Sequence, residues 1–310
     1  MSTAFLYPGQ GSQRVGMGAE LLETEGDLLT DYLRQAEAAS GQPIRKIMLE
    51  GPMEALTRTE VAQPALFCVS LAVTDAARAR GLQPDLVAGH SLGEYTAACA
   101  CGAVSIEDGI ELVSLRGRLM GEIGDERPGA MAAVIGLDAD TLAKLCEQAS
   151  EAGMVALANI NSPTQIVVSG EDDGVDRLME LAEAAGATRI VRLQVAAAFH
   201  SELMMPVQEQ MAEAVREIAW SDPRIPVASN SRGAIVRDAE TLQAALVEQI
   251  ASPVRWVECV HALVDAGATS FLESGPGRVL GGLVRQIHPD ADVFSADSPA
   301  RLDEFAAAHP

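Results

Sequence analysis

The chain has 310 residues and a mass of 32.5 kDa, which is more than a single hydrophobic core usually organises. Hydrophobic residues make up 48% of the sequence and charged residues 21%, a balance typical of a globular protein and not of a disordered one. The formal net charge of −22 opposes binding to nucleic acid or to an anionic membrane surface. We therefore expect one large domain that carries a smaller one, with no nucleic acid and no membrane among its partners.

Cysteine usage and the N-terminal sequence both favour a cytoplasmic protein. The five cysteines are scattered through apolar stretches, in a pattern unlike a disulfide framework or a zinc site. We expect them to be reduced core residues, and we expect no metal in the functional site. The first residues lack the basic region of a signal peptide, and no stretch reaches the roughly 18 apolar residues of a membrane-spanning helix.

Before residue 127, short apolar runs that end in glycine-containing turns alternate with segments of helical periodicity. This order of strand, tight turn and helix is typical of an α/β protein with a mainly parallel sheet. The predicted strands are residues 4–7 and 86–88, and the predicted helices are residues 27–39, 65–79, 94–101 and 106–123.

Residues 127–194 form one self-contained cycle with the order β-α-β-β-α-β, which is the ferredoxin-like plan. Its predicted strands are residues 131–135, 155–158, 165–168 and 189–193, and its predicted helices are residues 139–150 and 173–185. We interpret this segment as a small domain inserted into a large α/β-hydrolase-like domain made of residues 1–126 and 195–310.

The α/β pattern resumes after the inserted segment. The predicted helices are residues 201–218, 241–250, 257–266 and 279–287, and the predicted strands are residues 226–229 and 270–273.

The sequence Gly89-x-Ser91-x-Gly93 has the form of a nucleophile elbow, in which two glycines permit a cramped turn that exposes the serine hydroxyl. A predicted strand precedes it and a predicted helix follows it. The amide of Leu92 would therefore lie at a helix N-terminus, where an oxyanion could form. An ordinary glycine-rich turn with a capping serine is the alternative interpretation.

A serine nucleophile needs a general base, and the chain offers five histidines. His90 adjoins the serine and suits the rim of the pocket better than the position of the base. His200 follows a run of small residues and precedes a predicted helix, so it is our candidate for the base. The other three are expected to be structural or surface residues; they are His261, His288 and His309. No aspartate can be assigned as a third member, so we expect a backbone carbonyl to orient the imidazole.

Five spaced motifs resemble those of the malonyl-CoA:acyl carrier protein transacylases, a family related to the acyltransferase domains of polyketide synthases. The motifs are PGQGSQ at 8–13, GHSLGE at 89–94, RGRLM at 116–120, AFH at 198–200 and ESGPG at 273–277. The resemblance spans about residues 3 to 290. It implies an enzyme that moves a malonyl group from malonyl-CoA to the phosphopantetheine thiol of an acyl carrier protein, for fatty acid synthesis, without a cofactor. We expect it to act as a monomer.

The resemblance also implies roles for individual residues. Ser91 would carry the malonyl group, and His200 would be its base. Gln10 and the amide of Leu92 would line the oxyanion hole, and the carbonyl of Gln249 would orient the imidazole.

The family pattern assigns Arg116 to the free carboxylate of the malonyl group. A planar guanidinium suits this task, because it can hold a carboxylate with two parallel charge-assisted hydrogen bonds. His90, Met120 and Phe199 are assigned to the same substrate pocket. The large ring of Phe199 would leave little room for an α-methyl group, so we expect malonyl to be preferred over methylmalonyl, by about 1–3 kcal/mol. Without the family resemblance, Arg116 could also be interpreted as a surface or capping residue of its helix.

Three alternatives remain open at this stage. A serine hydrolase of α/β type would share the elbow but would need neither the arginine nor a carrier. A sister transacylase could serve a polyketide or malonate-decarboxylase pathway, and a docking subunit would not need a nucleophile. Because carrier proteins of this kind are acidic, we also expect a cationic docking patch. The candidates for it are Arg232, Arg255, Arg278 and Arg285.

Overall fold

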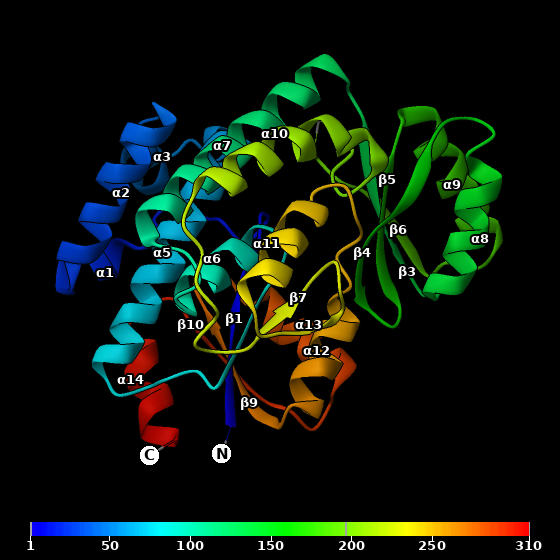
Figure 1. Cartoon of the computed structure of the whole chain (residues 1–310). Helices are drawn as coiled ribbons and strands as arrows, with labels where there is room; N and C mark the ends of the chain where they lie inside the picture. The colour runs from blue at the N-terminus through cyan, green and yellow to red at the C-terminus, as the bar shows by residue number, and fades with distance from the viewer. Residues whose placement is uncertain (1, 196, 310) are drawn as a thin grey trace.

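A computed structural model describes residues 2–195 and 197–309, which form two β-sheets with helices packed around them (Figure 1). The larger sheet has the strand order β10-β9-β1-β2-β7-β8. All its pairings are parallel except that of β7 with β8. Its strands are β1 (Ser2–Tyr7), β2 (Leu86–Gly89), β7 (Val227–Ser229), β8 (Ala234–Val236), β9 (Ala268–Ser274) and β10 (Asp292–Ala296). The predicted α/β class with a mainly parallel sheet is confirmed.

Helices cover both faces of this sheet, because successive side chains of its strands point to opposite sides. From β1, Phe5 and Tyr7 enter one apolar layer, whereas Ala4 and Leu6 enter the other, which contains Trp256. The helices are α1 (Ala19–Thr24), α2 (Gly26–Ser40), α3 (Ile44–Glu50), α4 (Met53–Thr57), α5 (Thr59–Ala79), α6 (Leu92–Ala100), α7 (Ile106–Glu126), α10 (Met205–Glu217), α11 (Ala239–Glu248), α12 (Trp256–Asp265), α13 (Val279–Ile287) and α14 (Pro299–Ala308).

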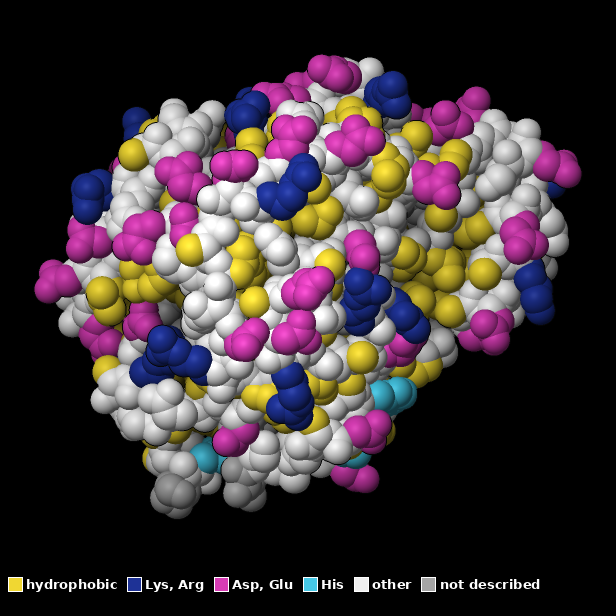
Figure 2. All heavy atoms as spheres, viewed as in Figure 1, with side chains coloured by type: hydrophobic (Ala, Val, Ile, Leu, Met, Phe, Trp, Pro, Cys, Tyr) yellow, Lys and Arg dark blue, Asp and Glu magenta, His cyan; other side chains and the backbone are white. Residues whose placement is uncertain are grey.

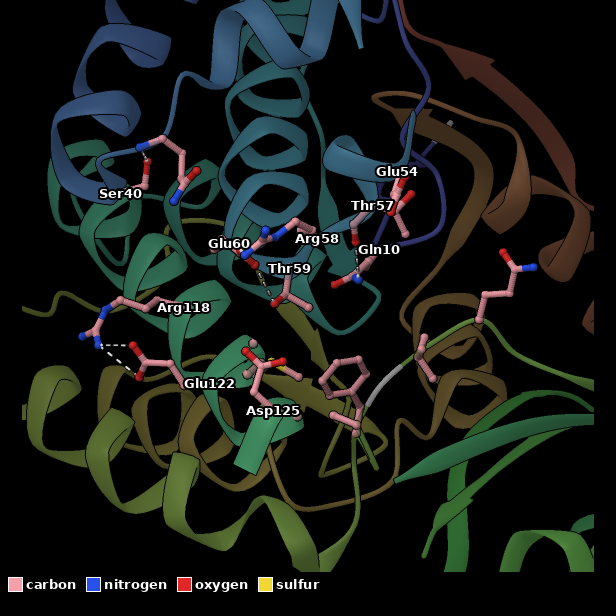
Figure 3. A pocket seen from close by; sticks show the side chains of 18 of the residues that line it. Gln10, Ser40, Glu54, Thr57, Arg58, Thr59, Glu60, Arg118, Glu122 and Asp125 are labelled. Atoms are coloured by element: carbon pink, nitrogen blue, oxygen red, sulfur yellow. Dashed lines mark hydrogen bonds and ion pairs between the residues drawn. The ribbon is translucent and has the colours of Figure 1, made fainter. Parts of the chain in front are cut away.

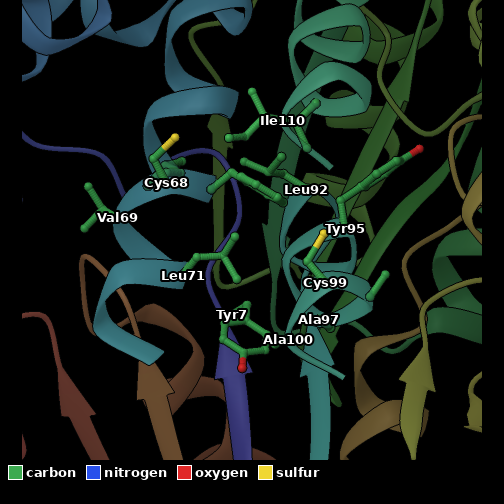
Figure 4. Packing of buried hydrophobic residues seen from close by; sticks show 14 of the residues in the cluster. Tyr7, Cys68, Val69, Leu71, Leu92, Tyr95, Ala97, Cys99, Ala100 and Ile110 are labelled. Atoms are coloured by element: carbon green, nitrogen blue, oxygen red, sulfur yellow. The ribbon is translucent and has the colours of Figure 1, made fainter. Parts of the chain in front are cut away.

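Helix α6 is the element that positions the elbow, and all of its residues are buried. Figure 4 shows Leu92, Tyr95 and Cys99 of α6 facing Cys68 and Leu71 of α5 across one apolar cluster. The N-terminus of α6 therefore sits rigidly at the carboxyl edge of the sheet, where open α/β sheets place their sites. The five cysteines are free and buried, as the sequence predicts.

The smaller sheet is antiparallel and has the strand order β4-β5-β3-β6. Its strands are β3 (Ala130–Ile135), β4 (Val155–Ser162), β5 (Gln165–Gly170) and β6 (Arg189–Arg192), and its helices are α8 (Ala139–Ala149) and α9 (Asp172–Ala184). In Figure 1 these elements lie together at one end of the molecule, with α8 and α9 on the outer side. The order of strands and helices along the chain matches the predicted β-α-β-β-α-β arrangement. The domain boundaries at residues 127 and 194 remain a prediction.

Main-chain hydrogen bonds join the two sheets beside the site. The amide of Ile160 in β4 donates to the carbonyl of Val254 at 2.9 Å, and the amide of Val254 donates to the carbonyl of Ala158 at 2.8 Å. Because Val254 lies between α11 and α12, the small sheet is tied to the segment that follows Gln249.

The prediction that a helix begins at residue 65 is wrong, because α5 begins at Thr59 and contains Pro64. A proline inside a helix removes one backbone hydrogen bond. Here α5 is buried on nearly all sides, so the packing of its apolar surface outweighs that loss.

Several short elements carry too little periodicity to be predicted; they are α1, α3, α4, α14, β8 and β10. Within the described residues, no helix has the length and apolar character needed to cross a bilayer.

Candidate active site

The turn between β2 and α6 places Ser91 in a conformation that side chains rarely adopt, with φ 53° and ψ −109°. The flanking glycines make this possible. A Cβ atom added to Gly89 would lie 1.8 Å from the carbonyl carbon of Gly93, and one added to Gly93 would lie 2.1 Å from the carbonyl oxygen of Tyr7. The backbone therefore packs on itself too closely for any side chain at these two positions.

Backbone strain also marks His200, whose φ is 59°. Within the described chain, Ser91 and His200 are the two residues other than glycine with a positive φ. Such strain costs about 1–3 kcal/mol per residue and persists only where the surrounding structure imposes it. The two residues are 109 positions apart in sequence, and the hydrogen bond between their side chains is 2.7 Å long.

The protonation of His200 follows from its partners. Its Nδ1 lies 2.8 Å from the backbone carbonyl of Gln249, which can only accept, so Nδ1 carries the proton and donates it. Burial, and then the charge of Arg116, lowers the pKa of His200 to about 3. The imidazole is therefore neutral at pH 7, and its Nε2 lone pair faces the Ser91 hydroxyl.

Arg116 reaches the same hydroxyl from helix α7. Its Nη2 donates to Ser91 Oγ at 3.0 Å and to Gln249 Oε1 at 3.1 Å, and its Nη1 donates to Gln63 Oε1 at 2.7 Å. Its side chain is almost fully buried, and its Nε has no hydrogen-bond partner among the described residues. The guanidinium thus lies beside the hydroxyl with only neutral groups in direct hydrogen-bond contact.

Arg118, two positions along α7, is not part of this cluster. It is exposed and pairs with Glu122 at 3.0 Å, one helical turn further on. This difference follows from the 3.6-residue period of the helix, which turns alternate residues to different faces.

The loop that carries Gln10 packs against the elbow. A Cβ atom on Gly9 would lie 2.5 Å from the carbonyl oxygen of His90, so this glycine allows the two segments to meet. The Nε2 of Gln10 donates to the carbonyl of Thr57 at 3.3 Å. Leu92 is the first residue of α6, where backbone amides lack partners inside the helix.

A cavity of about 940 Å³ opens between the start of α5, the C-terminal half of α7 and the segment that contains Gln194, Val195, Ala197 and Phe199. Gln10, Met120 and Phe199 line it, and Figure 3 shows charged side chains around it, among them Arg58 and Arg118. Ser91, His200 and Arg116 are not among its described lining residues. Two of the predicted substrate-pocket residues and the predicted oxyanion-hole residue Gln10 thus border this cavity, and the Ser91–His200–Arg116 cluster lies outside its lining.

His90 faces the small sheet. Its Nε2 lies 2.8 Å from Oδ1 of Asn161 in β4, and its ring centroid lies 5.4 Å from that of Trp256. Burial lowers the pKa of His90. The predicted rim residue therefore contacts the small sheet at the elbow.

Three polar residues that the sequence did not single out hold this cluster together. Asn230 accepts from the Ser91 amide and donates to the Gly89 carbonyl, both at 2.7 Å. Gln63 donates to Met120 Sδ at 3.4 Å while it accepts from the arginine. The third, Glu94, closes the GHSLGE motif, which was its only sequence signal.

The ESGPG motif has a structural role. The carboxylate of Glu273 accepts from the amides of Leu280 at 3.0 Å and Gly281 at 2.9 Å, in the first turn of α13. A carboxylate at this position satisfies free amides and complements the helix dipole.

Comparison with known proteins identifies the family of this chain. Residues 4–294 match the family model described as the acyl transferase domain. The chain belongs to the acyl transferase family. A member of the family from Bacillus subtilis, named malonyl CoA-acyl carrier protein transacylase, is 40% identical over 301 residues, which cover 97% of this chain and 95% of the relative.

Solved structures show the same likeness. The malonyl-CoA:acyl carrier protein transacylase of Xanthomonas oryzae superposes with a TM-score of 0.94 at 39% identity, covering 99% of both chains. A type II polyketide synthase acyl carrier protein in complex with its malonyl-transacylase gives a TM-score of 0.95 at 36% identity, covering 100% of both chains.

The close packing of the elbow predicts that Gly89→Ala destabilises the protein. Its Cβ would lie 1.8 Å from a backbone carbon, so we expect a loss of about 3 kcal/mol or more, measured by thermal or chemical unfolding. Gly282→Ala in α13 is the matched control, because it has open space and favours the helix. Equal stability of Gly89→Ala and wild type would contradict this account.

The low pKa of His200 predicts how the reactivity of Ser91 depends on pH. A base with a pKa of about 3 stays unprotonated as pH falls from 8 to 5, so the rate at which an uncharged fluorophosphonate labels Ser91 should stay nearly constant over that range. Mass spectrometry of the labelled peptide would measure the rate. A decline with a midpoint near 6.5, the ordinary value of histidine, that persists when Glu94 is replaced by glutamine would show that the imidazole is not held as described.

Proposed function

We propose that this protein is a malonyl-CoA:acyl carrier protein transacylase, which moves a malonyl group through an ester on Ser91. The observation that carries the proposal is the buried guanidinium of Arg116, 3.0 Å from the hydroxyl that also contacts a neutral imidazole. The names and full-length coverage of the relatives support the same activity.

In the first half-reaction, Ser91 Oγ attacks the thioester carbonyl of malonyl-CoA while His200 Nε2 takes its proton. The carbonyl of Gln249 stabilises the imidazolium that forms. The carbonyl oxygen of the substrate becomes an oxyanion, for which the Leu92 amide and Gln10 are the proposed donors. Collapse of this intermediate breaks the carbon–sulfur bond, and His200 returns the proton to the departing coenzyme A thiolate.

The second half-reaction runs the same steps in reverse with a new thiol. The phosphopantetheine thiol of the carrier gives its proton to His200 and attacks the Ser91 ester. The oxygen of Ser91 then leaves and recovers the proton. Each half-reaction exchanges one acyl group between two nucleophiles, so the proposed chemistry calls for no metal and no redox cofactor.

That the enzyme is cytoplasmic and monomeric remains a prediction from the sequence.

The Arg116 guanidinium is the proposed partner of the malonyl carboxylate. Its present contact with Ser91 Oγ involves a neutral acceptor, and its Nε has no partner, so a carboxylate would bind it more strongly. We propose that the carboxylate draws Nη2 away from Ser91 as the acyl group arrives. The guanidinium favours an acyl group with a free carboxylate, whereas the names of the relatives are the reason to prefer transfer over hydrolysis.

Selectivity between related acyl groups is a finer part of the proposal. Phe199 lines the cavity beside Met120, and we propose that its ring favours malonyl over methylmalonyl. Fatty acid synthesis is the pathway proposed for the product. A polyketide carrier is the second candidate, because one of the similar solved structures holds a type II polyketide synthase carrier protein.

The transfer can be followed by intact-mass analysis after mixing the protein with malonyl-CoA. We expect one malonyl adduct on the wild type, none on Ser91→Ala, and transfer to a carrier protein when one is added. Arg116→Ala should load malonyl at least about 100-fold more slowly, because it loses a buried charge-assisted pair.

Arg177→Ala on α9 is the control, since Arg177 is exposed, pairs with Glu180 and does not line the cavity, so it should leave loading unchanged. Free malonate released without transfer would identify a hydrolase instead.

For docking, we propose that Arg232 and Arg255 meet the acidic carrier. The two are adjacent, because Arg255 Nη1 donates to the Arg232 carbonyl at 3.3 Å, and both side chains are partly exposed. Arg255 belongs to the segment that follows Gln249, and Arg232 contacts it there. Figure 2 shows acidic side chains spread over the visible face. Arg232 pairs with Glu248 and Arg255 with Glu258, so acidic groups of the carrier would have to replace these glutamates.

Charge reversal tests this surface. Arg255→Glu should raise the KM for the carrier about fivefold, more at low salt, while loading from malonyl-CoA stays unchanged. Arg34→Glu is the control, because Arg34 is exposed and belongs to α2, which Figure 1 shows on the other side of the molecule from α12. An unchanged KM in Arg255→Glu would remove this patch from the proposal.

A further inference from the structure

Glu94 is a buried carboxylate that the catalytic scheme above does not use. It lies in the first turn of α6, three residues after Ser91, with none of its surface exposed. Its Oε1 accepts from the backbone amide of Asn230 at 3.1 Å, and its Oε2 accepts from Gln249 Nε2 at 2.7 Å. A carboxylate is costly to bury, so its place beside the site calls for an explanation.

Its partner Gln249 touches all three members of the reactive cluster. The backbone carbonyl of Gln249 accepts from His200 at 2.8 Å. Its side-chain Nε2 donates to the carbonyl of Ser91 at 3.0 Å, and its Oε1 accepts from Arg116 Nη2 at 3.1 Å.

The chemistry of the two side chains fixes the orientation of this amide. A glutamine amide can be turned over, because its two ends are nearly identical in size. An ionised carboxylate only accepts hydrogen bonds, so Glu94 requires the NH₂ end of Gln249 to face it. The oxygen end must then face Arg116, as it does in the structure. Glu94 also supplies the negative charge that offsets the buried guanidinium across one amide.

We propose that Glu94 is a positioning residue that makes the enzyme select acyl groups with a free carboxylate, because through Gln249 it holds the Arg116 guanidinium beside Ser91. This inference rests on the proposed function and deepens it. Acetyl-CoA offers no carboxylate to Arg116, so its reaction should depend little on Glu94.

The ionisation of Glu94 gives the proposal a pH signature. Burial raises its pKa to about 7, although its hydrogen bonds and the charge of Arg116 act in the opposite direction. Glu94 in turn acts electrostatically on Tyr95 of α6 and Cys259 of α12, and burial raises the pKa of both, that of Tyr95 to about 12. Arg116 on α7 remains a guanidinium cation. Below pH 7, Glu94 gains a proton and no longer dictates the orientation of the amide.

The test compares the loading of malonyl-CoA and acetyl-CoA on wild type and Glu94→Gln, a variant of nearly equal size without the charge. We expect the ratio of kcat/KM for malonyl to that for acetyl to fall at least about tenfold, mostly through a higher KM for malonyl-CoA. In wild type this ratio should rise as pH increases through 7, and in Glu94→Gln it should be independent of pH.

Other outcomes would overturn the inference. Equal losses for both thioesters would show that Glu94 only supports the fold of the elbow, and an unchanged ratio would show that it does not act on Arg116. A rise through pH 7 that persists in Glu94→Gln would assign the titration to another group.

A second variant keeps the test decisive if Glu94→Gln does not fold. Gln249→Met removes the amide but keeps the backbone carbonyl on His200, and it should lower the same ratio. Fluorophosphonate labelling of Ser91 would check that the elbow is intact in each variant. A wild type that fails to load malonyl would defeat the proposed function itself. A wild type that loads malonyl normally, together with variants that keep the same preference for malonyl over acetyl, would defeat only this inference.

Discussion

The Ser91 hydroxyl lies between a neutral imidazole that accepts its proton and a buried guanidinium that donates to it, at 2.7 and 3.0 Å. Much of the surrounding structure serves to hold these three groups together, although they come from the turn between β2 and α6, from α7 and from the loop before α10. Burial, and then the charge of Arg116, lowers the pKa of the imidazole, and the same cation offers the binding energy that a carboxylate-bearing acyl group would use. One interaction thus links the recognition of the substrate to the nucleophile.

This arrangement requires a rigid support, because Ser91 and His200 both have strained backbones. The support is mostly polar and local. Asn230 binds the backbone on both sides of the elbow, and Gln249 binds it once more while it orients His200. Below them, α6 is buried in apolar side chains, so the elbow cannot relax without disturbing the core.

The sequence predicts much of the fold because its long elements are periodic and its turns contain glycines. It predicts the meeting of Ser91 and His200 because a nucleophile needs a base and few histidines are available. It does not predict Gln63 or Asn230, since an amide side chain has no pattern that distinguishes a surface residue from a buried one. The predicted start of α5 is wrong for a related reason. The prediction relied on a proline, which is a local signal, whereas the burial that keeps α5 helical around Pro64 is a property of the whole fold.

The most direct measurement of the central claim is a crystal structure of the protein soaked with malonyl-CoA in the absence of a carrier. The account predicts a malonyl ester on Ser91 whose carboxylate oxygens bind the Arg116 guanidinium, with the hydrogen bond from Arg116 to Ser91 Oγ broken. A malonyl group whose carboxylate binds elsewhere while Arg116 still donates to Ser91 would contradict it.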